Sequence, residues 1–189
     1  MNKIRLIALF LISAWLLQSC KKDTFTGTVG NPNIRLQAFI DGTVWTPIDT
    51  INTTLTYSAA AQTKLFFCQG TVAQKQVSMA IKLPTNSNTA GFTLGTYVVD
   101  ATANTSLQYY TQQKNINGNY VFVPTGTTGP GSGSVTITAV DSVAKVITGY
   151  FNFISRKTNL DGSGNISSIE IHNITSGVFN KLPYTFTSN

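Results

Sequence analysis

Short runs in which apolar and polar residues alternate dominate the chain after residue 33. The clearest run is VSMAIKL, where Val77, Met79, Ile81 and Leu83 share one face of an extended strand and the residues between them share the other. An apolar period near 3.6 does not persist over ten residues anywhere in this region. The pattern predicts strands with one buried and one solvated face, and no helix.

A two-residue hairpin is predicted near the start of this region. In the stretch IRLQAFIDGTVWTPI, Asp41 and Gly42 stand between two β-rich runs. Asp-Gly favours a type I′ turn, which needs positive φ at both central positions. Trp45, on the return strand, is expected to pack inward.

Further strands are predicted from runs rich in Val, Ile, Thr, Phe and Tyr. They lie at residues 64–69, 95–100, 107–111, 119–123, 134–140, 146–154, 166–174 and 177–186. The spacing indicates one all-β domain over residues 34–189, an antiparallel β-sandwich or partly closed barrel of about nine to ten strands.

The first nineteen residues have the pattern of a signal peptide. Lys3 and Arg5 precede the apolar run LIALFLISAWLL, which at twelve residues is short for a membrane span. The segment LQSC that follows resembles a bacterial lipobox, which implies removal of residues 1–19 and lipidation of Cys20, palmitate included. An ordinary secretory signal with a chance cysteine is the alternative.

The resemblance to a lipobox also implies a location. Three acyl chains on Cys20 would hold the protein permanently at a membrane. Residues 21–33, KKDTFTGTVGNPN, are expected to form a flexible tether after the lipidated cysteine. The residue after Cys20 is Lys21. An Asp at this position would resemble a signal for retention in the inner membrane, so the outer membrane is expected. The leaflet is not determined.

Charge and composition argue against several functions. The whole chain has 13 Lys and Arg against 7 Asp and Glu, and Lys3 and Arg5 belong to the signal peptide. The remaining excess is scattered and forms no basic stripe, so nucleic-acid binding is not expected. Charged residues make up only 11% of the chain, and catalysis generally needs positioned ionisable groups. We therefore expect a protein that is not an enzyme and binds no cofactor.

The second cysteine of the chain, Cys68, lies in the apolar run KLFFCQG. With Cys20 committed to lipid, no intramolecular disulfide is available. The only histidine, His172, is remote in sequence, so Cys68 is expected to be a buried small hydrophobe and not a nucleophile.

A group of aromatic residues suggests a ligand surface. Tyr109, Tyr110 and Tyr120 fall in a region that is rich in Gln and Asn. Such a mixture could stack on and hydrogen-bond a sugar or a peptide. Neighbouring strand residues face opposite ways, so only one of Tyr109 and Tyr110 can belong to a given surface. Ordinary strand packing explains the same residues.

The rival prediction is an envelope hydrolase or metal-dependent enzyme that uses Glu170 and His172. These residues are two apart in SIEIHNI, so in a strand both point to the same face at about 7 Å. No second His or Cys lies nearby to complete a metal site. We expect a polar pair on the solvated side of Ile169 and Ile171, and no metal.

The order of several motifs resembles a known family. The motifs are AFIDGTVW at residues 38–45, GTY at 95–97, GSVTITAVD at 133–141, ITGYFNF at 147–153 and ITSGVFNKLPY at 174–184. In this order they resemble a family of small Bacteroidota lipoproteins known only as a domain of unknown function. The resemblance implies an all-β, membrane-anchored domain and brings no catalytic residues with it.

Overall fold

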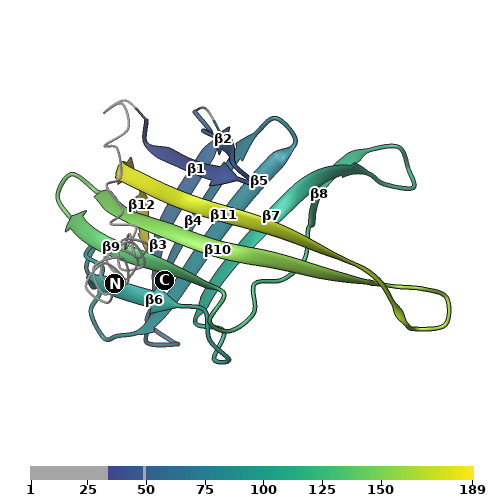
Figure 1. Cartoon of the computed structure of the whole chain (residues 1–189). Coiled ribbons are helices and arrows are strands. Elements are labelled where there is room, and N and C mark those ends of the chain that lie inside the picture. Colours follow the sequence, from purple (N-terminus) through teal and green to yellow (C-terminus); the bar gives the residue numbers. More distant parts are fainter. Residues whose placement is uncertain (1–33, 49) are drawn as a thin grey trace, which may run out of the picture.

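The computed structural model describes residues 34–48 and 50–189, which form strands and no helix (Figure 1). The predicted signal peptide, the lipidated Cys20 and the tether lie outside the described residues. The strands are β1 (Leu36–Ile40), β2 (Thr43–Trp45), β3 (Ile51–Ser58), β4 (Thr63–Val72), β5 (Lys75–Pro84), β6 (Gly95–Val98), β7 (Thr105–Lys114), β8 (Tyr120–Pro124), β9 (Gly133–Asp141), β10 (Val146–Leu160), β11 (Ile166–Pro183) and β12 (Thr185–Ser188). No helix in this part of the chain could cross a membrane.

The strands form two six-stranded sheets that pack as a sandwich, which confirms the predicted all-β class. Sheet A has the order β2-β1-β11-β10-β9-β6, and sheet B has the order β12-β3-β4-β5-β7-β8. Neighbouring strands are antiparallel except β12, which runs parallel to β3. The two separate sheets decide between the predicted alternatives in favour of the sandwich.

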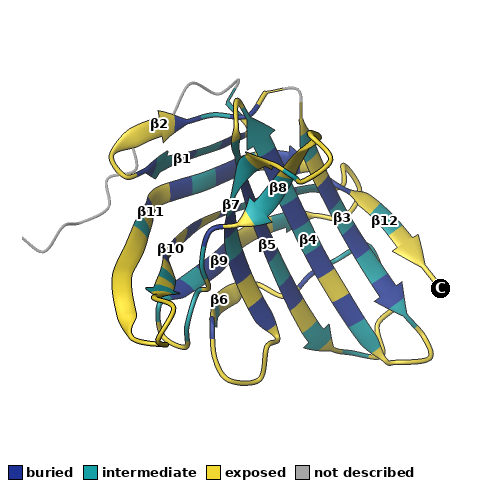
Figure 2. Ribbon diagram, turned by 90° about the vertical axis from the view of Figure 1, so that its right-hand side faces the viewer, coloured by how far each residue is buried: buried dark blue, intermediate teal, exposed yellow. Residues whose placement is uncertain are grey.

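Side chains from the inner faces of both sheets form one core. Along β5, Val77, Met79 and Ile81 are buried as the alternation predicts, but Ser78, on the face predicted to be solvated, is buried as well. The rings of Phe66 from sheet B and Phe179 from sheet A lie 6.2 Å apart between centroids. Figure 2 shows the resulting bands of buried and exposed residues along the strands.

The predicted hairpin is confirmed as β1–β2. Ile40 pairs with Thr43 across the two-residue turn, and φ is 51° at Asp41 and 78° at Gly42. These positive values are those that a type I′ turn requires. Trp45 is buried, and its indole N–H donates to the carbonyl oxygen of Lys75 at 3.3 Å.

Two strand predictions were wrong in detail. The structure has a strand over residues 51–58 that the apolar pattern did not reveal, because Thr53 interrupts the apolar residues Ile51, Leu55 and Tyr57 on its inner face. The predicted strands at 166–174 and 177–186 are mostly one strand, β11. Its pairing with β10 has register shifts, and Ser176 has a φ of 49°, so the strand bends without ending. The described residues form twelve strands, more than the nine to ten expected.

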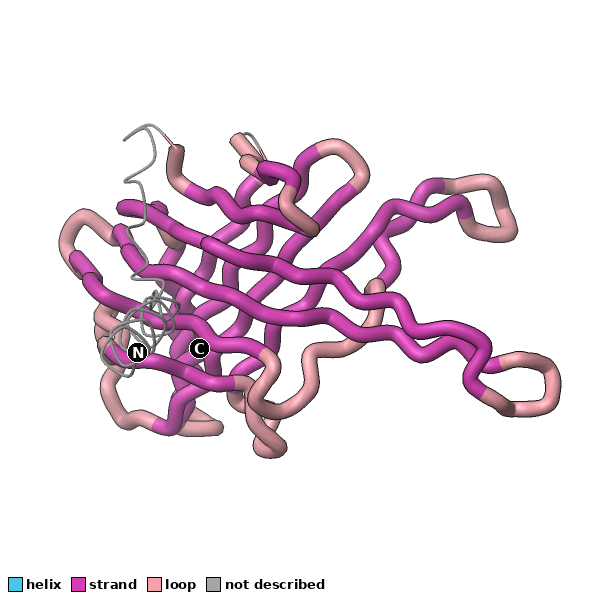
Figure 3. Tube along the Cα trace, viewed as in Figure 1, coloured by secondary structure: helices cyan, strands magenta, loops and turns pink. Residues whose placement is uncertain are grey.

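β10 and β11 extend well beyond the other strands of sheet A (Figure 3). The pairing of β9 with β10 ends at Phe153, and the pairing of β1 with β11 ends at Ile174. We call residues 155–173 the arm. Its tip is the turn 161–165, where Asp161 accepts hydrogen bonds from the backbone N–H groups of Ser163 and Asn165. The β7–β8 hairpin projects from the same end of the sandwich (Figure 1).

Candidate functional site

The outer face of sheet B gathers aromatic and amide side chains at β7 and β8. Tyr110 lies opposite Pro124, Gln112 opposite Phe122, and Lys114 opposite Tyr120. Directly opposed residues in an antiparallel pair point to the same face of the sheet. The register therefore places the three rings of Tyr110, Phe122 and Tyr120 on one side. We call this surface the aromatic face; it comprises Gln108, Tyr110, Gln112, Tyr120 and Phe122.

The aromatic face continues onto the central strands of the same sheet. Gln76 of β5 lies opposite Tyr110, and Ser78 lies opposite Gln108. On β4, Gln69 is the partner of Ser78. Four glutamine side chains therefore lie on this side of the sheet, although Gln76 is buried and donates to the Thr71 hydroxyl at 3.0 Å.

The three rings are placed along a line and differ in exposure. Alternate residues of a strand are about 7 Å apart, so the rings of Tyr110, Phe122 and Tyr120 span roughly 14 Å along the hairpin. Tyr120 is 64% exposed, and the other two rings are half-buried. The Tyr110 hydroxyl donates to the side-chain oxygen of Gln108, which fixes this ring on the face. The arrangement is an extended surface with stacking and hydrogen-bonding groups.

Tyr109, the third tyrosine that the sequence singled out, does not belong to this surface. It points inward from β7 and is only 2% exposed. Burial and the nearby negative charge of Asp41 raise the pKa of the Tyr109 hydroxyl. The alternation of strand residues, which allowed one tyrosine of the pair on any surface, assigns Tyr110 to the outer face and Tyr109 to the core.

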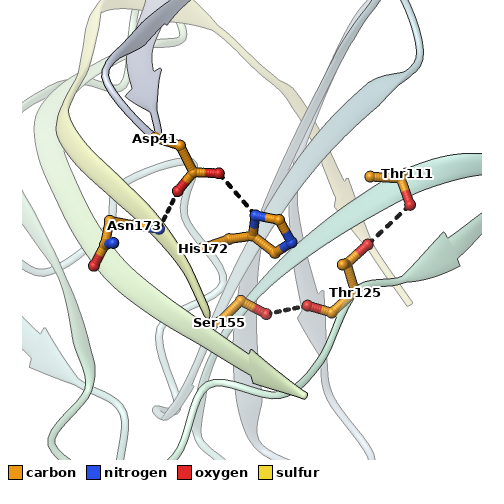
Figure 4. A network of polar contacts seen from close by, with 6 residues as sticks. All are labelled: Asp41, Thr111, Thr125, Ser155, His172 and Asn173. Atoms are coloured by element: carbon orange, nitrogen blue, oxygen red, sulfur yellow. Dashed lines mark hydrogen bonds and ion pairs between the residues drawn. The ribbon is translucent and has the colours of Figure 1, made fainter. Parts of the chain in front are cut away.

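A polar junction lies where the arm leaves the sandwich (Figure 4). Asp41, in the β1–β2 turn, contacts His172 of β11 at 2.7 Å between Oδ2 and Nδ1. The other carboxylate oxygen of Asp41 accepts the backbone N–H of Asn173 at 2.8 Å. The His172 ring packs edge-on against Tyr109, with centroids 5.0 Å apart. The orientation of the His172 ring is therefore fixed by Asp41 on one side and by Tyr109 on another.

Electrostatics at this junction favour the ionised form of Asp41. Partial burial disfavours the charge, but the hydrogen bonds from His172 and Asn173 outweigh it, so the pKa of Asp41 lies below its ordinary value. A carboxylate that accepts two such bonds is a fixed acceptor. The pair links the first hairpin of the chain to the base of the arm.

Ser155 completes the junction from the neighbouring strand. It lies directly opposite His172 in the β10–β11 ladder and is 1% exposed. Its hydroxyl donates to the carbonyl oxygen of Thr125 at 2.6 Å, and the Thr125 hydroxyl contacts that of Thr111 at 3.0 Å. Ser, His and Asp thus lie together, but the serine proton goes to a backbone carbonyl and not to the imidazole (Figure 4).

The predicted surroundings of Glu170 and His172 need a correction. The two residues share a face, as their spacing requires, but Glu170 accepts a hydrogen bond from Asn159 at 2.7 Å, and His172 pairs with Asp41. Their face is the continuation of the core face, because Ile174 two residues on is fully buried. The solvent-exposed outer side of the arm instead carries the apolar residues Ile169 and Ile171.

Cys68 is buried, as predicted. Desolvation raises the pKa of its thiol to about 12. A nucleophilic cysteine requires the opposite environment, with a lowered pKa and solvent access. The described residues also contain no group of three or more His, Cys, Asp or Glu placed to hold a metal ion.

The Asp41–His172 contact is the feature that sequence reasoning missed. The Asp-Gly pair was recognised as a turn, which explains the aspartate without any partner. Residues 131 positions apart carry no local signal of contact. Only the pairing of β1 with β11, which sets Ile40 opposite Ile174, brings them together.

Comparison with known proteins adds a family and no activity. No curated protein and no solved structure matches this chain. The model of one family, Domain of unknown function (DUF6252), matches residues 33–183 and so covers both sheets up to the end of β11. This agrees with the resemblance to a domain of unknown function that the order of the motifs indicated. The chain therefore belongs to the family of the domain of unknown function DUF6252.

Proposed function

We propose that this protein is a non-catalytic binding module of the cell envelope that holds an extended glycan or peptide against the aromatic face. The observation that carries the proposal is the β7–β8 register, which sets Tyr110, Phe122 and Tyr120 on one outer surface. Monomeric proteins seldom leave several aromatic rings accessible on one surface without a use for them.

The chemistry of the aromatic face fits such a ligand. Ring faces attract the apolar surface of a sugar or side chain, and amides donate and accept hydrogen bonds along it. Gln112 lies beside Phe122, and Gln76 lies beside Tyr110. A polymer lying across the strands would meet a ring and an amide in turn.

The membrane location is part of the same proposal and rests on the sequence. Lipidation of Cys20 after removal of residues 1–19 would anchor the domain through the tether 21–33, at the outer membrane in an undetermined leaflet. In the structure, β1 begins at Leu36, opposite Phe179, whereas the tip of the arm lies at residues 161–165. A tether attached there would leave the arm and the β7–β8 hairpin pointing away from the membrane.

The burial and hydrogen-bond partners of the reactive side chains support the proposal of a non-catalytic protein. Ser155 is buried, and its hydroxyl donates to the carbonyl oxygen of Thr125. Cys68 is also buried, which raises the pKa of its thiol. Glu170 and His172, the residues of the rival hydrolase proposal, each have a different partner. In this arrangement Asp41 and His172 serve to orient the arm.

The proposal is tested by binding of the chain from residue 21 onward to arrays of glycans, cell-wall fragments and peptides. Tyr110→Ala, Phe122→Ala and Tyr120→Ala are compared with Tyr150→Ala, an exposed tyrosine on the outer face of sheet A. We expect saturable binding of one ligand class, weakened roughly tenfold by at least one of the first three changes and unaffected by Tyr150→Ala. Absence of binding, or equal loss in the control, would overturn the proposal.

A further inference from the structure

A lysine occupies an inward position of β4. Lys64, Phe66 and Cys68 alternate on the core face of this strand, and Lys64 is only 5% exposed. Lysine is almost never buried to this degree unless its charge is paired, because desolvation of an ammonium group is costly. The alternation along β4 predicts an apolar residue at this position, so the burial of a lysine here requires an explanation.

The protein supplies only part of the partnership that a buried ammonium requires. Lys64 Nζ donates to the carbonyl oxygen of Gly91 at 2.8 Å. An ammonium group has three donors. Within residues 34–48 and 50–189, the structure contains one ion pair, between Asp41 and His172. Lys64 therefore has no carboxylate partner among these residues. Burial accordingly lowers the pKa of Lys64.

A cavity lies beside this ammonium. It has a volume of about 230 Å³, opens to solvent, and is bordered by the segment 85–93, which connects β5 of sheet B to β6 of sheet A. Half of its lining residues bear hydroxyls, and the others include one aromatic ring and one leucine: Thr85, Ser87, Thr89, Thr93, Phe92 and Leu83. No acidic residue is among those that line it. Hydroxyls can all donate hydrogen bonds, so donors and one positive charge converge on this space.

The hydroxyls are already held in place around the cavity. The Ser87 and Thr89 hydroxyls contact each other at 3.0 Å, and the Thr85 hydroxyl accepts the backbone N–H of Ser87 at 3.0 Å. The contact between Ser87 and Thr89 uses one of their two protons, so Thr85 and one member of that pair keep a proton to donate. A negatively charged group at this position would supply the charge that Lys64 lacks and would accept bonds from the surrounding hydroxyls.

We propose that this cavity binds a compact oxyanion, the carboxylate, sulfate or phosphate group of a small molecule, with Lys64 Nζ as its charged partner. The site is separate from the aromatic face, because Lys64 points into the sandwich whereas the aromatic face lies on the outside of sheet B. It does not depend on the proposed function. A purely structural role, in which Lys64 only ties Gly91 to β4, is the competing explanation.

The experiment titrates the chain from residue 21 onward, which contains all the described strands, with acetate, glucuronate, sulfate and phosphate at neutral pH. Ionic strength is kept constant with chloride. Binding is followed by the midpoint of thermal unfolding and by the amide NMR shift of Gly91. Lys64→Met removes the charge at similar volume, and Lys82→Met is the matched control, since Lys82 is exposed on the neighbouring strand β5.

At least one oxyanion should give a saturable rise in midpoint and a saturable Gly91 shift in the wild type and in Lys82→Met. In Lys64→Met the affinity should fall at least tenfold. Response to carboxylates alone would identify an organic acid as the source, and response to sulfate or phosphate would identify those groups. No saturable response in the wild type, or the same response in Lys64→Met, would overturn the proposal.

A second measurement covers the case in which Lys64→Met does not fold. The pKa of Lys64 can be followed in the wild type through the NMR shift of its ε-carbon. A bound oxyanion should raise this pKa toward the ordinary lysine value, because an adjacent negative charge favours the charged form. An unchanged pKa at saturating anion would equally overturn the proposal.

Discussion

Asp41 and His172, 131 residues apart in the sequence, are joined at 2.7 Å between Oδ2 and Nδ1. The contact ties the turn of the first hairpin to the strand that becomes the arm. It forms because β1 pairs with β11, so that the turn after Ile40 reaches the point where β11 leaves the sheet. The junction therefore determines where the sandwich ends and the arm begins.

Asp41→Asn should destabilise the protein in a pH-dependent way. Asparagine tolerates the positive φ of this position, so the change removes mainly the charge. We expect a loss of about 1 kcal/mol near neutral pH, which is the value of a charged hydrogen bond reduced for partial exposure to solvent. The free energy of unfolding is measured by urea titration with Trp45 fluorescence.

The sign of the pH effect follows from the lowered pKa of Asp41. The ionised Asp41 carboxylate contributes to the free energy of unfolding, and this contribution is fully present above the unfolded pKa of about 3.9. It is lost as the pH falls through the lower pKa of the folded state. Wild type and Asp41→Asn should therefore converge as the pH falls below about 4. Glu170→Gln, two residues from His172, is the control and should cost less at neutral pH. A larger effect for Glu170→Gln would show that the wrong carboxylate has been assigned to His172.

Gly149→Ala should be strongly destabilising. A Cβ at this position would lie 2.1 Å from the carbonyl oxygen of Thr136 and 2.5 Å from the ring of Phe179. Neither the ladder nor the ring can move freely, so we expect a loss of about 1–3 kcal/mol or more, as for an overpacked core. Gly162→Ala in the arm turn is the control, because nothing lies within 4 Å of its Cβ. Equal stability of the two variants in urea would contradict this packing.

Local patterns were sufficient for much of the fold. The alternation in Val77–Leu83 predicted the buried face of β5, and Asp41-Gly42 predicted the turn type. Both are properties of consecutive residues. The strand at residues 51–58 was missed because its Asn and Thr residues give little contrast between the faces.

Features that depend on which strands are neighbours could not be predicted. Tyr150 and Ile154 have large rings or apolar chains but are exposed, because they point to the outer face of sheet A. The alternation in β11 runs on past Ile174 into the arm, and nothing in it marks where β1 stops. The candidate site was predicted only in part for the same reason. The sequence identified the tyrosines, but the choice between Tyr109 and Tyr110 depends on which face of β7 points to the core.

The outer part of the arm, residues 158–169, should be dispensable for folding. Residues 160–171 are exposed on both faces, and the hydrogen bonds described from Lys157 to Ile171 run within the hairpin itself. Replacing residues 158–169 by Asn-Gly would join Lys157 to Glu170, which are cross-strand partners. We expect the free energy of unfolding to change by less than about 1 kcal/mol, as for surface substitutions. A loss of several kcal/mol would show that the arm packs against the domain.

Cys68 should be unreactive in the folded protein. Its thiol is buried and has a pKa of about 12, so on the order of one molecule in 10⁴ carries the thiolate at pH 8. In the chain from residue 21 onward it is the single cysteine. Iodoacetamide should therefore leave the native mass unchanged and add one label after unfolding in guanidinium, with Cys68→Ser unlabelled in both states. Native labelling at the rate of a free small thiol would mean that the core face of β4 opens to solvent, and would also weaken the argument that Lys64 is held buried on the same face.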